Sequence, residues 1–149
     1  MTEIQEKANT IPQELSIAEI RKYTKEAAPL IHCITNPISI HDCANIILAA
    51  GARPIMAEHP AEVAEITAVA SALMLNLGNI TDARIESIQR ALKEANRRKI
   101  PVLLDLVGVT CSSLRREFAR KLLADGRFAV IKGNISEILA AADLPFHGT

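Results

Sequence analysis

The stretch ALMLNLG, residues 72–78, is a short and almost continuous apolar run that ends in an amide and a glycine. Such a run indicates a strand that is buried on both faces of a sheet. Similar runs occur at four other places: PLIHCIT (29–35), RPIMA (53–57), PVLLDLVG (101–108) and FAVIKGN (128–134). The sequence therefore predicts five strands.

Segments with helical spacing of apolar residues separate these runs. They lie at 16–27 behind Ser16, at 39–50 before Gly51, after Pro60, from Thr81 to Arg98, from Ser112, and near 136–142. Serine and threonine before a helix and glycine after it are ordinary end signals. Regular alternation of strands and helices predicts an α/β fold with a parallel sheet and right-handed crossovers.

The composition predicts one cytoplasmic domain. Seventeen Lys and Arg balance seventeen Asp and Glu, and aromatic residues are 3% of the 149, so neither nucleic acid nor a membrane surface is favoured as a partner. Residues 1–15, MTEIQEKANTIPQEL, are too charged for a signal peptide, and three cysteines without one indicate reduced thiols. We expect 1–15 to be a mobile leader and 16–149 to be the folded part.

The stretch HCITNPISIHDCAN, residues 32–45, raises the question of a metal site. His32, Cys33, His41 and Cys43 are zinc-ligand types, but the paired close spacing that is typical of zinc sites is missing. The cysteines fit buried apolar positions better, and neither histidine has an identifiable role. Asn36, followed by Pro37 where strand becomes helix, favours polar recognition of a ligand instead.

Ligands of open parallel sheets bind at the carboxyl ends of the strands. Residues at or just beyond these ends are Asn36, Met56, Asn76, Asp105, Lys132 and Glu137. Asp105 with Glu137 could hold Mg²⁺ directly or through water, and Lys132 could bind nucleotide phosphates. An Asp105–Lys132 salt bridge is an equally weighted alternative. No P-loop, dinucleotide fingerprint or serine-hydrolase elbow is found.

Six ordered segments resemble hydroxyethylthiazole kinase, a family of the ribokinase-like superfamily. They are HCITNPISIHDCAN, GARPIMAEHPAEV, ALMLNLGNI, IPVLLDLVGV, RREFARKLL and AVIKGNISEI, between Pro29 and Glu137. The resemblance covers the N-terminal half of that family. It implies a three-layer fold with a mainly parallel sheet, here truncated after about five αβ units. It also implies a homotrimer that uses ATP and Mg²⁺ to phosphorylate 4-methyl-5-(2-hydroxyethyl)thiazole in thiamine salvage.

The resemblance also implies roles for individual residues. Met56 and Asn36 match substrate-binding positions, Asp105 and Glu137 match acidic residues near magnesium, and Lys132 stands where many members have an ATP-contacting arginine. Lysine keeps the charge but loses the bidentate fork. Leu106 in DLVGV, and the TCSS that follows, depart from the family's usual D-P-V-G and Gly-Ala-Thr-like turn.

Length is the largest departure from the family. The cysteine beside the substrate hydroxyl and the glycine-rich anion hole would lie beyond residue 149, so no catalytic residue is assigned here and the chain alone is expected to be a poor kinase. Instability or dependence on self-association is also expected. The alternatives are a non-catalytic thiazole-binding or trimer-assembly module and, less favoured, another small-molecule enzyme such as a sugar-kinase relative.

Overall fold

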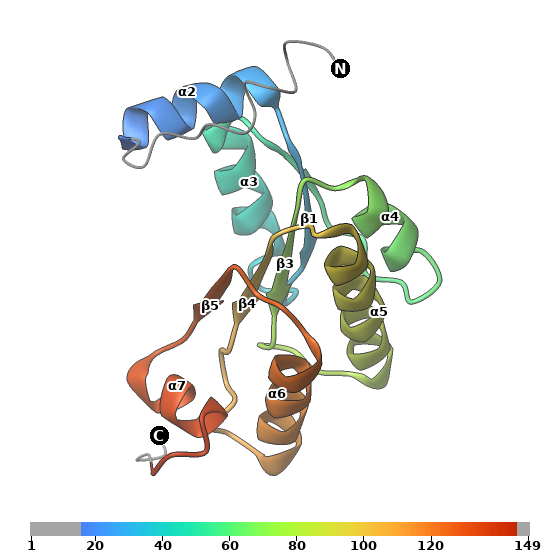
Figure 1. The fold of residues 1–149 in the computed structure, drawn as a ribbon, viewed down its shortest axis with the longest axis vertical. Coiled ribbons are helices and arrows are strands. Elements are labelled where there is room, and N and C mark those ends of the chain that lie inside the picture. Colours follow the sequence, from blue (N-terminus) through green and yellow to red (C-terminus); the bar gives the residue numbers. More distant parts are fainter. Residues whose placement is uncertain (1–15, 146–149) are drawn as a thin grey trace.

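The computed structural model describes residues 16–145, which form an α/β fold around a five-stranded parallel sheet (Figure 1). The strand order is β2-β1-β3-β4-β5. The strands are β1 (Leu30–Ile34), β2 (Arg53–Ile55), β3 (Ala72–Asn76), β4 (Val102–Asp105) and β5 (Val130–Lys132). The α/β class and the parallel sheet predicted from the sequence are confirmed. The expected leader, 1–15, lies outside the described residues.

Helices follow the strands in strict alternation. They are α2 (Ile17–Ala27), α3 (Ile40–Ala50), α4 (Val63–Val69), α5 (Asp82–Arg98), α6 (Ser113–Asp125) and α7 (Ile135–Ala141). The polar residues before three of them act as caps, because the side chains of Ser16, Thr81 and Ser112 each accept from a backbone N–H in the first turn. The helix starts predicted at these residues are therefore confirmed.

The core lies between the sheet and the helices α4, α5 and α6, which are on one side of it, whereas α3 lies on the other (Figure 1). Sheet residues that face α4–α6, such as Ile34, Leu75 and Leu104, are completely buried. Helix α5 contributes Ile88 and Leu92 to the same core. This packing holds the strands in one register and so determines where their carboxyl ends lie.

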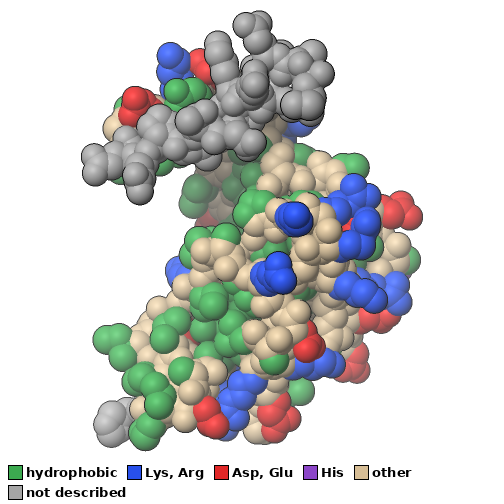
Figure 2. Space-filling model, viewed as in Figure 1, with side chains coloured by type: hydrophobic (Ala, Val, Ile, Leu, Met, Phe, Trp, Pro, Cys, Tyr) green, Lys and Arg blue, Asp and Glu red, His purple; other side chains and the backbone are tan. Residues whose placement is uncertain are grey.

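Burial of the strands on both faces is contradicted by the structure. Ile31, Met74 and Leu103, on the face toward α3, are only half-buried, and they line a shallow groove of about 270 Å³ with Ile47 and Val130. Among residues 16–145, helix α3 covers only part of that face. Apolar side chains of β5 and α7 are also exposed, and Figure 2 shows them in the same view as Figure 1.

Every predicted strand is longer than the strand observed, mainly at its carboxyl end. In β3 the ladder stops at Asn76, and in β4 it stops at Asp105. The backbone N–H groups of Leu77 and Leu106 still donate to the neighbouring strand. Beyond them, the backbone N–H of Gly78 donates to the Asn76 side chain and that of Val107 to the Asp105 side chain. These two strand ends therefore coincide with the polar residues that interrupt the apolar runs.

Candidate functional site

The strand register brings the predicted site residues together. Asn76 on β3 is paired with Asp105 on β4, and Asp105 is paired with Lys132 on β5. Parallel neighbours in register present side chains on the same face of the sheet, so these three point to one side. Asn36 leaves β1 on the other flank of β3 and reaches the same place.

Hydrogen bonds connect these four side chains in a row across the sheet. Asn36 Nδ2 donates to Asn76 Oδ1 (3.3 Å), and Asn76 Nδ2 donates to Asp105 Oδ2 (3.2 Å). Lys132 Nζ donates to the same Asp105 oxygen, also at 3.2 Å. The row runs from the residue predicted to meet the thiazole to the one predicted to meet ATP.

Both amides in the row have a defined orientation. Asn36 Oδ1 accepts from the backbone N–H of Ser39 (3.1 Å), which leaves its NH₂ group to face Asn76. Asn76 Oδ1 accepts from Asn36 and from the backbone N–H of Gly78 (2.8 Å), so both of its lone pairs are used. One N–H of each amide remains for a ligand.

The Asp105–Lys132 salt bridge that the sequence offered as an alternative is present. The Asp105 side chain is 11% exposed, whereas that of Lys132 is 66% exposed. A carboxylate buried to this degree needs hydrogen bonds, and Asp105 has three donors: Asn76, Lys132 and the backbone N–H of Val107. The exposed Lys132 ammonium can still reach an anion in solvent, so the pair and phosphate binding are compatible.

Glu137 lies in the first turn of α7 and is 8% exposed. One of its oxygens accepts from the backbone N–H of Gly108 (2.9 Å) and the other from that of Asn134 (2.8 Å), completing a capping box with Asn134. Glu137 therefore ties α7 to the loop that follows β4. Glu137 thus accepts from Gly108 of this loop, and Asp105 is the last residue of the strand that precedes the loop.

The two carboxylates keep acceptor capacity that water around a magnesium ion could use. Each carboxylate oxygen has two acceptor positions, and Asp105 Oδ1 and both oxygens of Glu137 have one donor each. Hard oxygen ligands with room for water are the environment that Mg²⁺ prefers. Within residues 16–145 no group of three or more His, Cys, Asp or Glu is placed to hold a metal ion.

Among the described residues, the histidines and cysteines of residues 32–45 form no group that could hold a metal ion. His32 Nε2 donates to the carbonyl oxygen of Ala57 (2.8 Å) and its Nδ1 accepts from the Thr67 hydroxyl (2.9 Å), and burial lowers the pKa of the ring. Cys33 is buried, which raises its pKa to about 12, whereas His41 is exposed on α3. The stretch therefore holds a neutral buried histidine and an unreactive thiol.

Met56 follows β2 and is half-buried, at the carboxyl end of a strand next to β1. It lies in the segment that His32 fixes through Ala57. Asn36 leaves the neighbouring strand at its carboxyl end. The structure thus brings Met56 to the same edge of the sheet as Asn36, outside the row of hydrogen bonds.

Sequence reasoning missed residues that shape this edge. Asn76 is predicted only as a strand end, yet it is the residue that joins the two halves of the row. Arg115 of α6 donates to the carbonyl oxygens of Leu77 and Gly78 and so fixes the loop after β3. A polar residue inside an apolar run could have indicated Asn76, but Arg115 looks like any charged residue on a helix.

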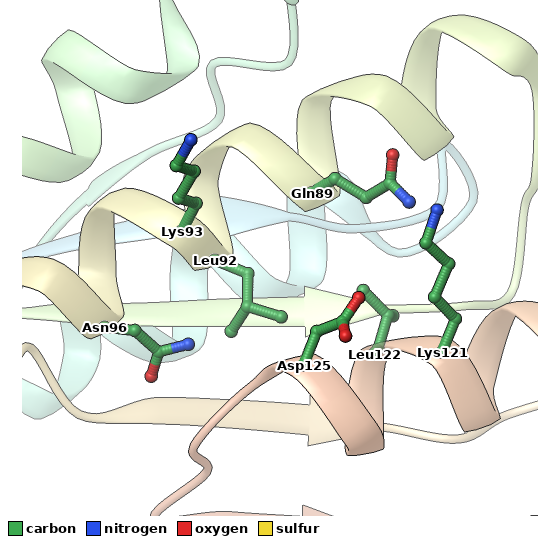
Figure 3. A pocket seen from close by; sticks show the side chains of 7 residues that line it. All are labelled: Gln89, Leu92, Lys93, Asn96, Lys121, Leu122 and Asp125. Atoms are coloured by element: carbon green, nitrogen blue, oxygen red, sulfur yellow. The ribbon is translucent and has the colours of Figure 1, made fainter.

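A separate hollow of about 370 Å³ lies between α5 and α6 (Figure 3). Leu92 and Leu122 face each other in it, with Lys93, Lys121 and Asp125 around them. None of the predicted site residues lines this hollow. The candidate site is therefore at the strand ends and not between these helices.

The family model for the hydroxyethylthiazole kinase family matches residues 21–148. The chain belongs to the hydroxyethylthiazole kinase family. Hydroxyethylthiazole kinase 2 of Clostridium botulinum (strain 657 / Type Ba4) is 59% identical over 122 residues, and a hydroxyethylthiazole kinase of Clostridium acetobutylicum is 54% identical over 114. These matches cover 82% and 76% of this chain.

A solved hydroxyethylthiazole kinase structure supports the same fold. The protein from Pyrococcus horikoshii OT3 superposes with a TM-score of 0.80 at 34% identity, over 84% of this chain and 49% of that one. The chain spans 46% of the C. botulinum relative and 42% of the C. acetobutylicum relative. Its similarity to this kinase family therefore concerns about half of each relative. Among the residues described, no helix is long and apolar enough to cross a membrane.

Proposed function

We propose that this chain is the N-terminal part of a hydroxyethylthiazole kinase that transfers the γ-phosphate of ATP to 4-methyl-5-(2-hydroxyethyl)thiazole, in the cytoplasm and as a homotrimer. The observation that carries the proposal is the row from Asn36 to Lys132 at one sheet edge, in a chain of this family. The proposed enzyme acts in thiamine salvage.

In this proposal Asn36 and Met56 bind the thiazole. The free N–H of Asn36 supplies a hydrogen-bond donor for a polar heteroaromatic ring, and the Met56 thioether supplies a polarisable apolar contact. Both residues come from strands at the same flank of the sheet, β1 and β2. This flank is the acceptor end of the proposed site.

The phosphate end lies at β4 and β5. Lys132 would bind ATP, and Asp105 and Glu137 would hold Mg²⁺ directly or through water. A magnesium ion held there would supply positive charge that neutralises the phosphates. Asp105 holds Lys132 at 3.2 Å until phosphates compete for the ammonium group.

The test is formation of ADP by the purified 149-residue chain with hydroxyethylthiazole and MgATP. The Asp105→Ala variant excludes a contaminating kinase, and Asp125→Ala, an exposed position at the end of α6, is the matched control. Turnover that is lost in Asp105→Ala and kept in Asp125→Ala would support the kinase, and it would contradict the expectation that the chain alone is a poor one. Turnover that survives Asp105→Ala would contradict it.

A second candidate is a thiazole-binding or trimer-assembly module without chemistry. The observation in its favour is that both proposed thiazole contacts, Asn36 and Met56, lie at one edge of the described sheet, whereas no catalytic residue is assigned among residues 16–145. A folded chain that binds the thiazole saturably but forms no ADP would favour this candidate over a chain that is a kinase by itself.

A further inference from the structure

The segment Met56–Glu58, between β2 and α4, is fixed by side chains from β1 and α5. His32 Nε2 donates to the carbonyl oxygen of Ala57 (2.8 Å). Ser87 Oγ lies 2.7 Å from the carbonyl oxygen of Glu58 and 2.8 Å from that of Ala83, so its proton is shared. The side chain of Glu58 pairs with Arg84. Backbone and side chain of this segment are thus both restrained.

Arg84 is the charged member of this group. It lies in the first turn of α5 and is 4% exposed, although it is an arginine on the outer layer of helices. Its Nη1 donates to the carbonyl oxygen of Thr35 (2.6 Å), and its Nη2 donates to the Glu58 carboxylate. A buried guanidinium is retained only where its hydrogen bonds are satisfied, and here two of them go to other elements.

The two partners of Arg84 flank the two proposed thiazole contacts. Thr35 immediately precedes Asn36, and Glu58 follows Met56 by two residues. A planar guanidinium holds its partners in a fixed fork, which an ammonium group on a flexible stem does not do. Arg84, together with the His32 contact to Ala57, therefore sets how far the end of β1 is from the segment after β2.

Arg84 is not needed to build its own helix. Helix α5 starts with Thr81, whose hydroxyl accepts from the backbone N–H of Arg84, and packs through Ile88, Ala91 and Leu92. The guanidinium contacts with Thr35 and Glu58 both leave the helix. The side chain thus acts on the strand-end loops and not on α5.

We propose that Arg84 is a positioning residue for the thiazole end of the site: it holds the Met56 segment against the end of β1 and so fixes the gap between Met56 and Asn36. The inference rests on the proposed function for its ligand. The contacts of Arg84 with Thr35 and Glu58 do not depend on the proposed function. Arg84 does not touch the thiazole in this arrangement, and ATP, at β4 and β5, is not affected by it.

The experiment compares Arg84→Met and Arg84→Lys with Arg97→Met. Arg97 is on the same helix but exposed, where it pairs with Glu94, so it controls for loss of an arginine from α5. Three quantities are measured on the full chain: the NMR order parameters of the backbone amides of residues 56–59, and the affinities for hydroxyethylthiazole and for MgATP by titration calorimetry. If Arg84→Met does not fold, Glu58→Gln breaks the same charge pair at a more exposed position.

We expect the order parameters at 56–59 to fall in Arg84→Met and not in Arg97→Met. Thiazole binding should weaken about tenfold or more, because displacement of a binding group by a fraction of an ångström has effects of this size, while MgATP binding stays within about twofold. Arg84→Lys should restore part of the thiazole affinity, since it keeps the charge but not the fork.

Unchanged order parameters at 56–59 in Arg84→Met would overturn the proposal. Equal weakening of thiazole and MgATP binding would also overturn it, because a general loss of structure acts on both. If the wild-type chain binds no thiazole, the proposed function fails instead, and the order parameters alone then decide whether Arg84 ties the segment to β1.

Discussion

Asn76 and Asp105 occupy paired positions on adjacent strands, and the amide of Asn76 donates to a carboxylate oxygen of Asp105 across 3.2 Å. The same amide accepts from Asn36, so Asn76 connects the thiazole end of the proposed site to its phosphate end. Its neutrality matters, because a negatively charged side chain in its place would face a carboxylate that is almost buried.

The Asn76→Asp variant tests this relationship with almost no change in shape. It replaces an N–H donor by an oxygen close to Asp105 and puts two carboxylates in contact. We expect the free energy of unfolding at pH 7 to fall by about 1–3 kcal/mol, as for a buried polar group left unsatisfied. Urea denaturation measures it, with Asn45→Asp on the exposed face of α3 as the control.

The sign of the pH dependence distinguishes this cause from general damage. In the folded variant, repulsion raises the pKa of the carboxylate introduced at position 76 above its value in the unfolded chain. Stability is then present at low pH and lost as pH rises through the raised pKa. The deficit of Asn76→Asp against wild type should therefore shrink between pH 7 and pH 5. A deficit that is equal at both pH values would contradict the explanation.

Lys132→Met should weaken MgATP binding by about tenfold, because one charge-assisted contact is lost and Asp105 then faces the phosphates without its cation. Lys132→Arg should bind MgATP at least as tightly as wild type, since its fork can contact a phosphate through two N–H groups. Thiazole affinity should not change in either variant. Calorimetric titrations of both ligands test this, and equal MgATP affinity in Lys132→Met and wild type would remove Lys132 from the proposed nucleotide site.

The fold could be predicted from the sequence because its signals are local. Ser16, Thr81 and Ser112 start helices where a side-chain acceptor is needed, and apolar runs such as 72–76 form strands. The partly exposed sheet face at Ile31 and Met74 was not predictable, since an apolar run does not reveal how many helices cover each face of its strand. The number of covering helices depends on the other elements of the fold.

The site was predictable only in part. Position at a strand end indicated Asn36, Asp105 and Lys132. The register pairs Asp105 with Lys132, and hydrogen bonds through Asn76 connect Asn36 to them. Arg84 could not be found in this way, because its partners are 49 and 26 residues away in sequence. Contacts between a helix and a distant loop leave no periodic signal in the sequence.

Gly78→Ala tests the close approach at the thiazole end. A Cβ at this position would lie 2.8 Å from Asn76 Oδ1 and 3.0 Å from Asn36 Nδ2. One of the two amides must then move, although Asn76 is held by Asp105. We expect thiazole binding to weaken about tenfold with a loss of about 1 kcal/mol in stability. Titration and urea denaturation measure the two effects, and unchanged thiazole affinity would show that the orientation of Asn36 does not matter for binding.

His32 should make stability depend on pH in the mildly acidic range. Burial lowers its pKa in the folded state, so protons bind the unfolded chain more readily as pH falls below about 6.5. Stability is therefore complete above that pH and declines toward the lowered pKa, with a slope of at most about 1.4 kcal/mol per pH unit for one proton.

The measurement is urea denaturation of wild type and His32→Gln between about pH 7.5 and 5, a range set by the ordinary histidine pKa of about 6.5. His41→Gln, at an exposed position on α3, is the control and should follow the wild-type curve. His32→Gln should be less stable at the upper end of this range, because the hydrogen bonds to Ala57 and Thr67 are altered, yet its curve should be flatter. Parallel curves for wild type and His32→Gln would mean that His32 does not remain neutral in the folded chain.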